Sequence, residues 1–265
     1  MATTPTGLFY EVHDGPPGAA SLILSAGLGG SAGFWAPQMA ALTAAFRVIG
    51  YDHRGTGRSV RDLTRPHSVE AMADDIAEVM DAAGEERAHL LGHAAGGLAG
   101  LALALKHPDR LDRLVVVSGW VAPDPHIRRC FDTRLHLLGD SGPAAYVHAQ
   151  ALFLYPANWI SRNTARLDAE EPHHLAAFPS LEVMRQRIGA LLAFDIAARL
   201  GDIQTPTLVY ASADDMLVPV LCSEQLAAGL PNGVLEIAPW GGHGFTVTAP
   251  DQFNARVTAY LAHGH

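Results

Sequence analysis

The sequence predicts an α/β protein, in which a mostly parallel central sheet carries helices on both faces and an all-helical insertion interrupts the sheet. Short apolar, β-rich runs alternate with helical patterns over residues 8–120 and again over 205–262, which is typical of a parallel sheet flanked by helices. Between them, from 121 to 200, no stretch has a convincing strand pattern. With 265 residues, 49% of them hydrophobic, the chain can bury a sizeable core.

The first half of the chain is expected to supply five strands, at residues 8–12, 21–25, 46–51, 89–91 and 114–118. Helices are expected between them, from Phe34 through Met39, from Ser68 to Gly84, and from Leu98 to Leu105. The last of these helices is apolar on nearly every side. A helix of that kind is normally buried, so we expect it in the middle of the molecule.

The insertion is expected to form a helical cap, with helical segments at residues 128–138, 143–152, 165–178 and 181–192. Strands at 205–210 and 234–237 and a helix at 250–262 complete the chain. This pattern divides the sequence into a core of residues 1–120 and 201–265 and a cap of residues 121–200. In a doubly wound sheet the cap would sit above the C-terminal ends of the strands, where ligands bind.

The most informative motif is a nucleophile elbow with one residue changed, LLGHAAGGLAG at residues 90–100. In the pattern G-x-S-x-G a serine sits on a strained turn between a strand and a helix, and the glycines let the two elements approach closely. Here Gly92 and Gly96 hold the flanks, and Ala94 occupies the middle. A methyl group can neither lose a proton nor attack a carbonyl, so the acyl-enzyme route of a serine hydrolase is closed.

An acid and a histidine follow the elbow in the order that hydrolases with this motif use. We expect His243 to move protons, because imidazole both accepts and donates a proton near pH 7. Asp215, 28 residues earlier, is expected to orient it, with Asp214 as the alternative; the separation allows one strand and one helix between them. The backbone N–H groups of Leu28 and Ala95 are the expected oxyanion hole.

The cap is expected to contribute the substrate-binding residues Arg128, Tyr155 and Trp159. A guanidinium can bind a small carboxylate, and the two rings can line a cavity under the cap. The alternatives are a solvated surface charge for Arg128 and plain packing within the cap for the rings. Cys130 is expected to be a small buried residue rather than a nucleophile.

Three further residues are expected to be structural. His93 precedes the central position of the elbow, and a side chain there usually points away from the cleft. Asp52 and Arg54 are expected to hold their loop in place by charge-assisted hydrogen bonds.

Composition excludes several classes of function. A formal net charge of -9 without any cluster of Lys and Arg argues against partners such as nucleic acid or an anionic membrane. The 14 histidines are not spaced as metal ligands, so we expect neither metal nor cofactor. Two cysteines, and an N-terminus without the layout of a secretory signal, favour the cytoplasm. The expected partner is a small-molecule substrate; the assembly, whether monomer or homodimer, is left open.

Four segments in the right order resemble the α/β-hydrolase superfamily over the whole chain: the elbow, DHRGTGRS at 52–59, Asp215 with Val218-Pro219, and Gly242-His243. The resemblance implies the α/β-hydrolase fold. A narrower resemblance, carried by HIRRCF at 126–131, ALFLYPANW at 151–159 and the elbow itself, is to the RutD-like family of bacterial pyrimidine utilisation. It implies a hydrolase of carbamate or aminoacrylate in uracil breakdown, with alanine native at the elbow. Ala26 departs from the histidine that many hydrolases carry before the oxyanion glycine.

These observations lead to the hypothesis that His243 and Asp215 act as acid–base catalysts, while water replaces the serine nucleophile at Ala94. Two alternatives remain open at this point. The chain can be a non-catalytic protein that only binds a small metabolite, or an esterase inactivated by an engineered alanine.

Overall fold

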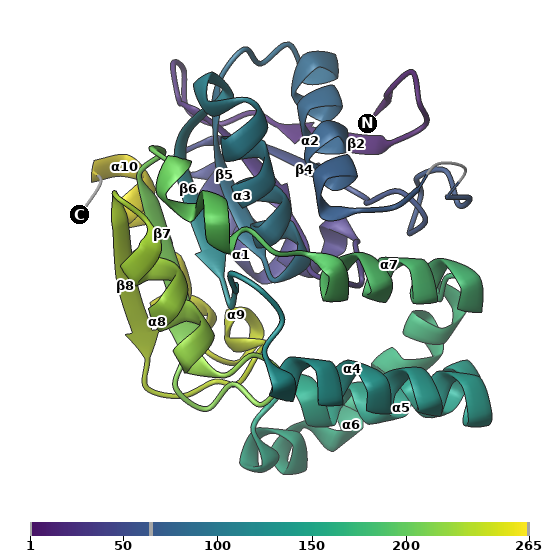
Figure 1. Cartoon of the computed structure of the whole chain (residues 1–265). Helices are drawn as coiled ribbons and strands as arrows, with labels where there is room; N and C mark the ends of the chain where they lie inside the picture. The colour runs from purple at the N-terminus through teal and green to yellow at the C-terminus, as the bar shows by residue number, and fades with distance from the viewer. Residues whose placement is uncertain (1, 64–65, 264–265) are drawn as a thin grey trace.

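The computed structural model describes residues 2–63 and 66–263, and it confirms the α/β fold class. An eight-stranded sheet with the order β1-β2-β4-β3-β5-β6-β7-β8 lies at the centre (Figure 1). The pairs β1–β2 and β2–β4 are antiparallel, and all other pairs are parallel. The strands are β1 (Ala2–Thr3), β2 (Phe9–His13), β3 (Ser21–Ser25), β4 (Arg47–Tyr51), β5 (Ala88–His93), β6 (Leu111–Val117), β7 (Thr207–Ser212) and β8 (Gly233–Ala238).

The helices surround this sheet and extend beyond one end of it. They are α1 (Ala36–Thr43), α2 (Val69–Ala83), α3 (Ala95–Lys106), α4 (Pro125–His136), α5 (Gly142–Leu154), α6 (Ala157–Ala176), α7 (Leu181–Ala193), α8 (Val220–Gly229), α9 (Phe245–Thr248) and α10 (Pro250–His263). Short 3-10 turns cover Ala32–Trp35, Pro108–Arg110 and Ala197–Asp202, and a π-helical turn covers Leu137–Ser141. Among the described residues, no helix has the length and apolar character needed to span a membrane.

The core is divided by the sheet into two apolar layers. Ile23 of β3 faces the layer formed with α2, α3 and α8, whereas Leu22 and Leu24 face the layer formed with α1 and α10. This alternation follows from the period of two along a strand. The elbow helix α3 is buried from Ala95 to Ala104, which confirms that it lies in the middle of the molecule.

Local signals fix α2 as the sequence predicts. The Ser68 hydroxyl accepts a hydrogen bond from the Ala71 N–H at 3.1 Å, and Gly84 ends the helix with a φ of 78°. Side-chain caps of this type supply a partner for an N–H that the helix leaves unpaired, and a left-handed C-terminal residue favours glycine.

The helices α4 to α7 lie between β6 and β7 in the chain, and Figure 1 shows them beyond the C-terminal ends of the parallel strands. Helix α6 begins at Ala157, earlier than the predicted residue 165. The reason is that polar residues in its first turns stay helical by bonding back to the preceding turn. Ser161 donates to the Ala157 carbonyl and Asn163 to the Trp159 carbonyl, so these side chains do not break the helix.

The strand predicted at 205–210 begins and ends two residues later than expected, at Thr207 and Ser212. Its last residues, Ala211 and Ser212, pair in parallel register with Ile237 and Ala238 of β8. Helix α8 and strand β8 then separate the two acidic residues of the next loop from His243, as the sequence spacing predicts.

Candidate active site

The turn between β5 and α3 has the backbone of a nucleophile elbow, although residue 94 is alanine. Ala94 has φ 44° and ψ −110°, a conformation that costs a residue with a Cβ on the order of 1–3 kcal/mol. Its N–H donates to the Val117 carbonyl of the neighbouring strand at 2.7 Å. The chain therefore keeps the strained turn without the hydroxyl that the turn presents in serine hydrolases.

Glycines at the flanks of the elbow permit this turn. A Cβ placed on Gly92 would lie 2.5 Å from the carbonyl carbon of Gly96, and one placed on Gly96 would lie 2.1 Å from the carbonyl oxygen of Ser25. Both separations are far below van der Waals contact. Strand and helix approach as closely as the motif predicts, because no side chain stands between them.

His243 and Asp215 form a buried hydrogen-bonded pair. Nδ1 of His243 lies 2.9 Å from Oδ2 of Asp215, and their side chains are 3% and 1% exposed. The other carboxylate oxygen accepts from the backbone N–H groups of Leu217 and Val218, at 2.9 and 2.8 Å. Burial acts to raise the pKa of Asp215, but the charge and hydrogen bond of His243 and the Val218 N–H lower it below its ordinary value. Asp215 is therefore ionised at neutral pH.

Asp214, the alternative acid, has different partners. Its Oδ1 accepts from the Ser212 hydroxyl at 2.7 Å and from the Gly242 N–H at 2.8 Å. It therefore holds the loop that carries His243, while Asp215 contacts the imidazole itself.

The elbow and the histidine meet through His93, the residue before Ala94. Nε2 of His93 lies 2.9 Å from the carbonyl oxygen of His243, and the two rings meet edge to face with centroids 4.6 Å apart. His243 therefore lies against the end of β5, beside the elbow.

Of the two expected oxyanion donors, Leu28 lies on the loop after β3 and Ala95 lies at the start of α3. Ala95 is the first residue of α3, so its N–H has no partner within the helix and lies at the positive end of the helix dipole. Leu28 belongs to the glycine-rich loop after β3, and its carbonyl accepts hydrogen bonds from Arg187 of the cap.

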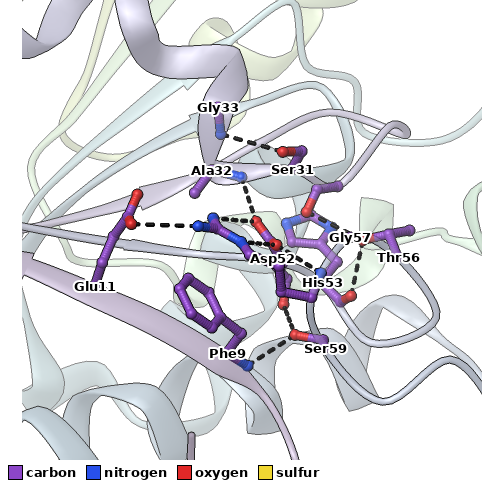
Figure 2. Close-up of polar contacts among 12 residues, drawn as sticks. Phe9, Glu11, Ser31, Ala32, Gly33, Asp52, His53, Thr56, Gly57 and Ser59 are labelled. Carbon is purple, nitrogen blue, oxygen red and sulfur yellow. Dashed lines mark hydrogen bonds and ion pairs between the residues drawn. The ribbon is translucent and has the colours of Figure 1, made fainter. Parts of the chain in front are cut away.

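Asp52 holds this glycine-rich loop in place, as Figure 2 shows. Its carboxylate accepts from the Ala32 N–H at 2.8 Å and from the backbone N–H and Nε of Arg58, both at 2.8 Å. Burial acts to raise the pKa of Asp52, but the hydrogen bonds from Arg58 and Ala32 outweigh it. The pKa of Asp52 is therefore below its ordinary value. Arg54 has the matching structural role in the same loop and donates to both oxygens of Asp75.

Arg187 of α7 fastens the cap to the core. Its Nη2 and Nε donate to the Leu28 carbonyl at 2.8 and 3.2 Å, and its Nη1 donates to the Arg54 carbonyl at 3.1 Å. Nη2 also lies 3.2 Å from Nδ1 of His53, which therefore acts as an acceptor. Burial lowers the pKa of Arg187 to about 10, which leaves it protonated at neutral pH. Its charge is thus fixed beside the glycine-rich loop.

The cap residues expected to bind substrate have separate positions. Tyr155 is partly buried and lies against Gly244, since a Cβ on that glycine would meet its ring carbon Cε1 at 2.6 Å. Trp159 packs on Tyr155 with ring centroids 4.5 Å apart. Arg128 is not brought to the site: it is exposed, and its Nη1 lies 3.4 Å from the Leu192 carbonyl. It lines an outer groove of α4 together with Arg129 and Asp132.

Two buried arginines in the cap, Arg134 and Arg187, were not among the residues singled out from the sequence. For Arg134, the spacing of apolar residues along α4 is the signal in the sequence that could have identified it. Arg134 lies on the same face of α4 as the buried residues Ile127 and Phe131, seven and three positions earlier. A basic residue on the apolar face of a helix needs a polar partner or a ligand.

A sheet of this strand order, an elbow after β5, and an acid and a histidine after β7 and β8 define an α/β hydrolase. A family model described as "Serine aminopeptidase, S33" matches residues 16–247. A protein of Caulobacter sp. (strain K31) named "Putative carbamate hydrolase RutD" is 68% identical over 98% of this chain and 97% of its own. One of Variovorax paradoxus (strain S110) with the same name is 51% identical over 96% of both chains. The chain belongs to the RutD family of α/β hydrolases.

Solved structures agree with this fold. The enol-lactonase from Burkholderia xenovorans LB400 has a TM-score of 0.88 and 26% identity, covering 98% of this chain and 99% of that one. A hydrolase from Pseudomonas aeruginosa PA01 has a TM-score of 0.83 and 27% identity, covering 96% and 94%. The similarity spans the cap as well as the core, because nearly the whole of each chain is matched.

Proposed function

We propose that this protein releases ammonia from a small carbon–nitrogen compound, carbamate or 3-aminoacrylate, in pyrimidine breakdown, by acid–base catalysis without a covalent intermediate. One observation carries the proposal: a buried His243–Asp215 pair at 2.9 Å is maintained beside an elbow that has no nucleophile. The name of its RutD relatives supports the substrate class. The retained pair argues against a protein that only binds a metabolite.

In this mechanism the two side chains have distinct roles. Asp215 holds Nδ1 of His243 and stabilises the imidazolium, so the Nε2 atom is the one that gives and takes protons. Because residue 94 carries only a methyl group, Nε2 of His243 has no hydroxyl to activate. Its proton-transfer partners are instead the substrate and water. The N–H groups of Leu28 and Ala95 stabilise negative charge on the substrate.

Each candidate substrate then reacts without an acyl-enzyme. In 3-aminoacrylate, a proton is added to C2, water adds to C3 of the resulting iminium, and the C–N bond breaks to give ammonia and 3-oxopropanoate. In carbamate, a proton is added to nitrogen and the C–N electron pair leaves with it, which gives ammonia and carbon dioxide. Both compounds are intrinsically labile, so a contribution of roughly 10²–10⁴-fold from acid–base catalysis is sufficient.

The test is a time course of ammonia release from each substrate, with spontaneous decay measured in parallel. His243→Ala should slow the protein-dependent rate at least tenfold, because it removes the proton-transferring group. His148→Ala is the matched control, since His148 is an exposed histidine of the cap paired with Glu171. An unchanged rate in His243→Ala would remove this residue from the mechanism. Stoichiometric ligand binding without turnover by the wild type would instead support a binding protein.

A further inference from the structure

Arg134 is a buried cation for which the described part of the chain supplies no anion. It is 5% exposed, and its Nε has no hydrogen-bond acceptor. Its guanidinium lies among three aromatic rings, 4.8 Å from the centroid of Tyr146, 5.5 Å from Phe153 and 5.7 Å from Phe131. Ring faces attract a cation, but they do not replace the hydrogen bonds that a buried guanidinium gives up on leaving water.

The position of Arg134 points to the active site. It lies one helical turn from Cys130, which on α4 corresponds to roughly 6 Å along the axis. The Cys130 sulfur lies 3.8 Å from the carbonyl oxygen of Met216, the residue after Asp215. The charges of Arg134 and Asp215 both act on the pKa of the Cys130 thiol, in opposite directions, so Cys130 lies between the guanidinium and the His243–Asp215 pair. A ligand bound to Arg134 can extend toward His243 without competing for the same atoms.

Arg187 adds a second positive charge whose field reaches Tyr146. Burial raises the pKa of the Tyr146 phenol, and the charge of Arg134, its hydrogen bond to the phenol oxygen and the charge of Arg187 oppose that rise. The acceptors of Arg187 are two carbonyls and an imidazole, none of which neutralises its charge. Two buried cations therefore act on one phenol. The carboxylate of Asp75 acts on Arg187 but is not among the charges that act on Tyr146, so the surroundings of this phenol favour an anionic ligand.

We propose that Arg134 binds the carboxylate of the substrate, and that the site therefore selects small monocarboxylate anions. This inference rests on the proposed function for the identity of the substrate, but not for the binding itself. The guanidinium fork matches the two oxygens of a carboxylate. The Tyr146 hydroxyl, which now faces the sulfur of Met184 at 3.8 Å, has only a weak acceptor and can donate to the same carboxylate.

Binding of an unreactive carboxylate tests the proposal without any turnover. Propionate and its neutral isostere propionamide are titrated against the protein by ligand-observed NMR. The wild type should bind propionate at least tenfold more tightly than propionamide, and Arg134→Gln should lose at least tenfold of the propionate affinity, as expected for a charge-assisted pair. Arg134→Lys, which retains the charge but not the fork, should fall between them.

Arg128→Gln is the matched control, because Arg128 is an exposed arginine of the same helix; it should bind propionate like the wild type. Equal affinity for propionate and propionamide, or unchanged propionate binding in Arg134→Gln, overturns the proposal. If Arg134→Gln fails to fold, two other results test the proposal: the wild-type preference for propionate over propionamide, and the propionate affinity of Arg134→Lys.

The two hypotheses fail in different ways. Ammonia release by Arg134→Gln with an unchanged KM would refute the carboxylate site and leave the proposed function intact. Propionate binding that depends on Arg134, in a wild type without turnover, would support the site and refute the function.

Discussion

The imidazole of His93 donates a hydrogen bond to the backbone carbonyl of His243, with Nε2 and the oxygen 2.9 Å apart. A carbonyl only accepts, so the proton of His93 is on Nε2, and its Nδ1 is left unprotonated and without a hydrogen-bond partner in the described residues. Burial is the main cause that lowers the pKa of His93 to about 3, and the neighbouring His243 is the second. The strand that leads into the elbow thus also supports His243 through a neutral ring.

This depressed pKa predicts a pH dependence of stability. Below the unfolded value of about 6.5, His93 binds a proton in the unfolded chain but not in the folded one, so acid destabilises the fold until pH about 3. In His93→Gln this contribution is absent. The free energy of unfolding should therefore fall less steeply than in the wild type, by up to about 1.4 kcal/mol per pH unit. Urea unfolding at pH 6, 5 and 4 measures both slopes, and parallel slopes would contradict the prediction.

A comparison of Asp215→Asn with Asp214→Asn should distinguish the roles of the two acidic residues in the loop after β7. Asp215→Asn removes the charge that stabilises the His243 imidazolium, so kcat for ammonia release should drop by about 100-fold or more. Asp214→Asn keeps an oxygen that accepts from Ser212 and Gly242, so its kcat should remain within a few-fold of the wild type. Equal losses in both variants would show that Asp215 acts only through the structure of the loop.

Much of the fold and part of the site could be predicted because their causes are local. The elbow depends on Gly92 and Gly96, whose missing side chains determine how closely a strand and a helix approach. The order of Asp215 before His243 follows from strand succession, because neighbouring parallel strands bring their C-terminal loops to one edge of the sheet. The structure places these two side chains 2.9 Å apart.

The cap could not be predicted at the same level, because the burial of a helix face depends on partners distant in sequence. Arg128 and Arg134 are chemically identical and share α4, but only Arg134 faces the rings of Tyr146 and Phe153. Those rings belong to the following helix α5. The spacing from Ile127 and Phe131 identifies Arg134 as the arginine on the apolar face of α4, but local composition carries no information on how α4 and α5 pack, so it does not show what that face meets.

Gly96→Ala should test the close approach of α3 and β3. The added Cβ would lie 2.1 Å from the Ser25 carbonyl oxygen, and backbone on both sides prevents relaxation. We expect a loss of about 3 kcal/mol or more in the free energy of unfolding. In Gly189→Ala, the control in α7, the Cβ meets nothing within 4 Å, so the helix should gain roughly 0.5–1 kcal/mol. Chemical denaturation compares the two; a Gly96→Ala protein of wild-type stability would contradict the geometry.

Ala94→Ser should introduce a covalent route at the elbow. The backbone of residue 94 already has the elbow conformation, and His243 packs against the preceding residue, so we expect a hydroxyl placed at 94 to reach His243 as its base. With p-nitrophenyl acetate, Ala94→Ser should release a burst of about one p-nitrophenol per chain as the acyl-enzyme forms, whereas the wild type should show none. The double variant Ala94→Ser/His243→Ala should lose the burst, because no base remains to activate the hydroxyl. Absence of a burst from Ala94→Ser would mean that residue 94 is out of reach of His243, and a burst from the wild type would reveal a different nucleophile.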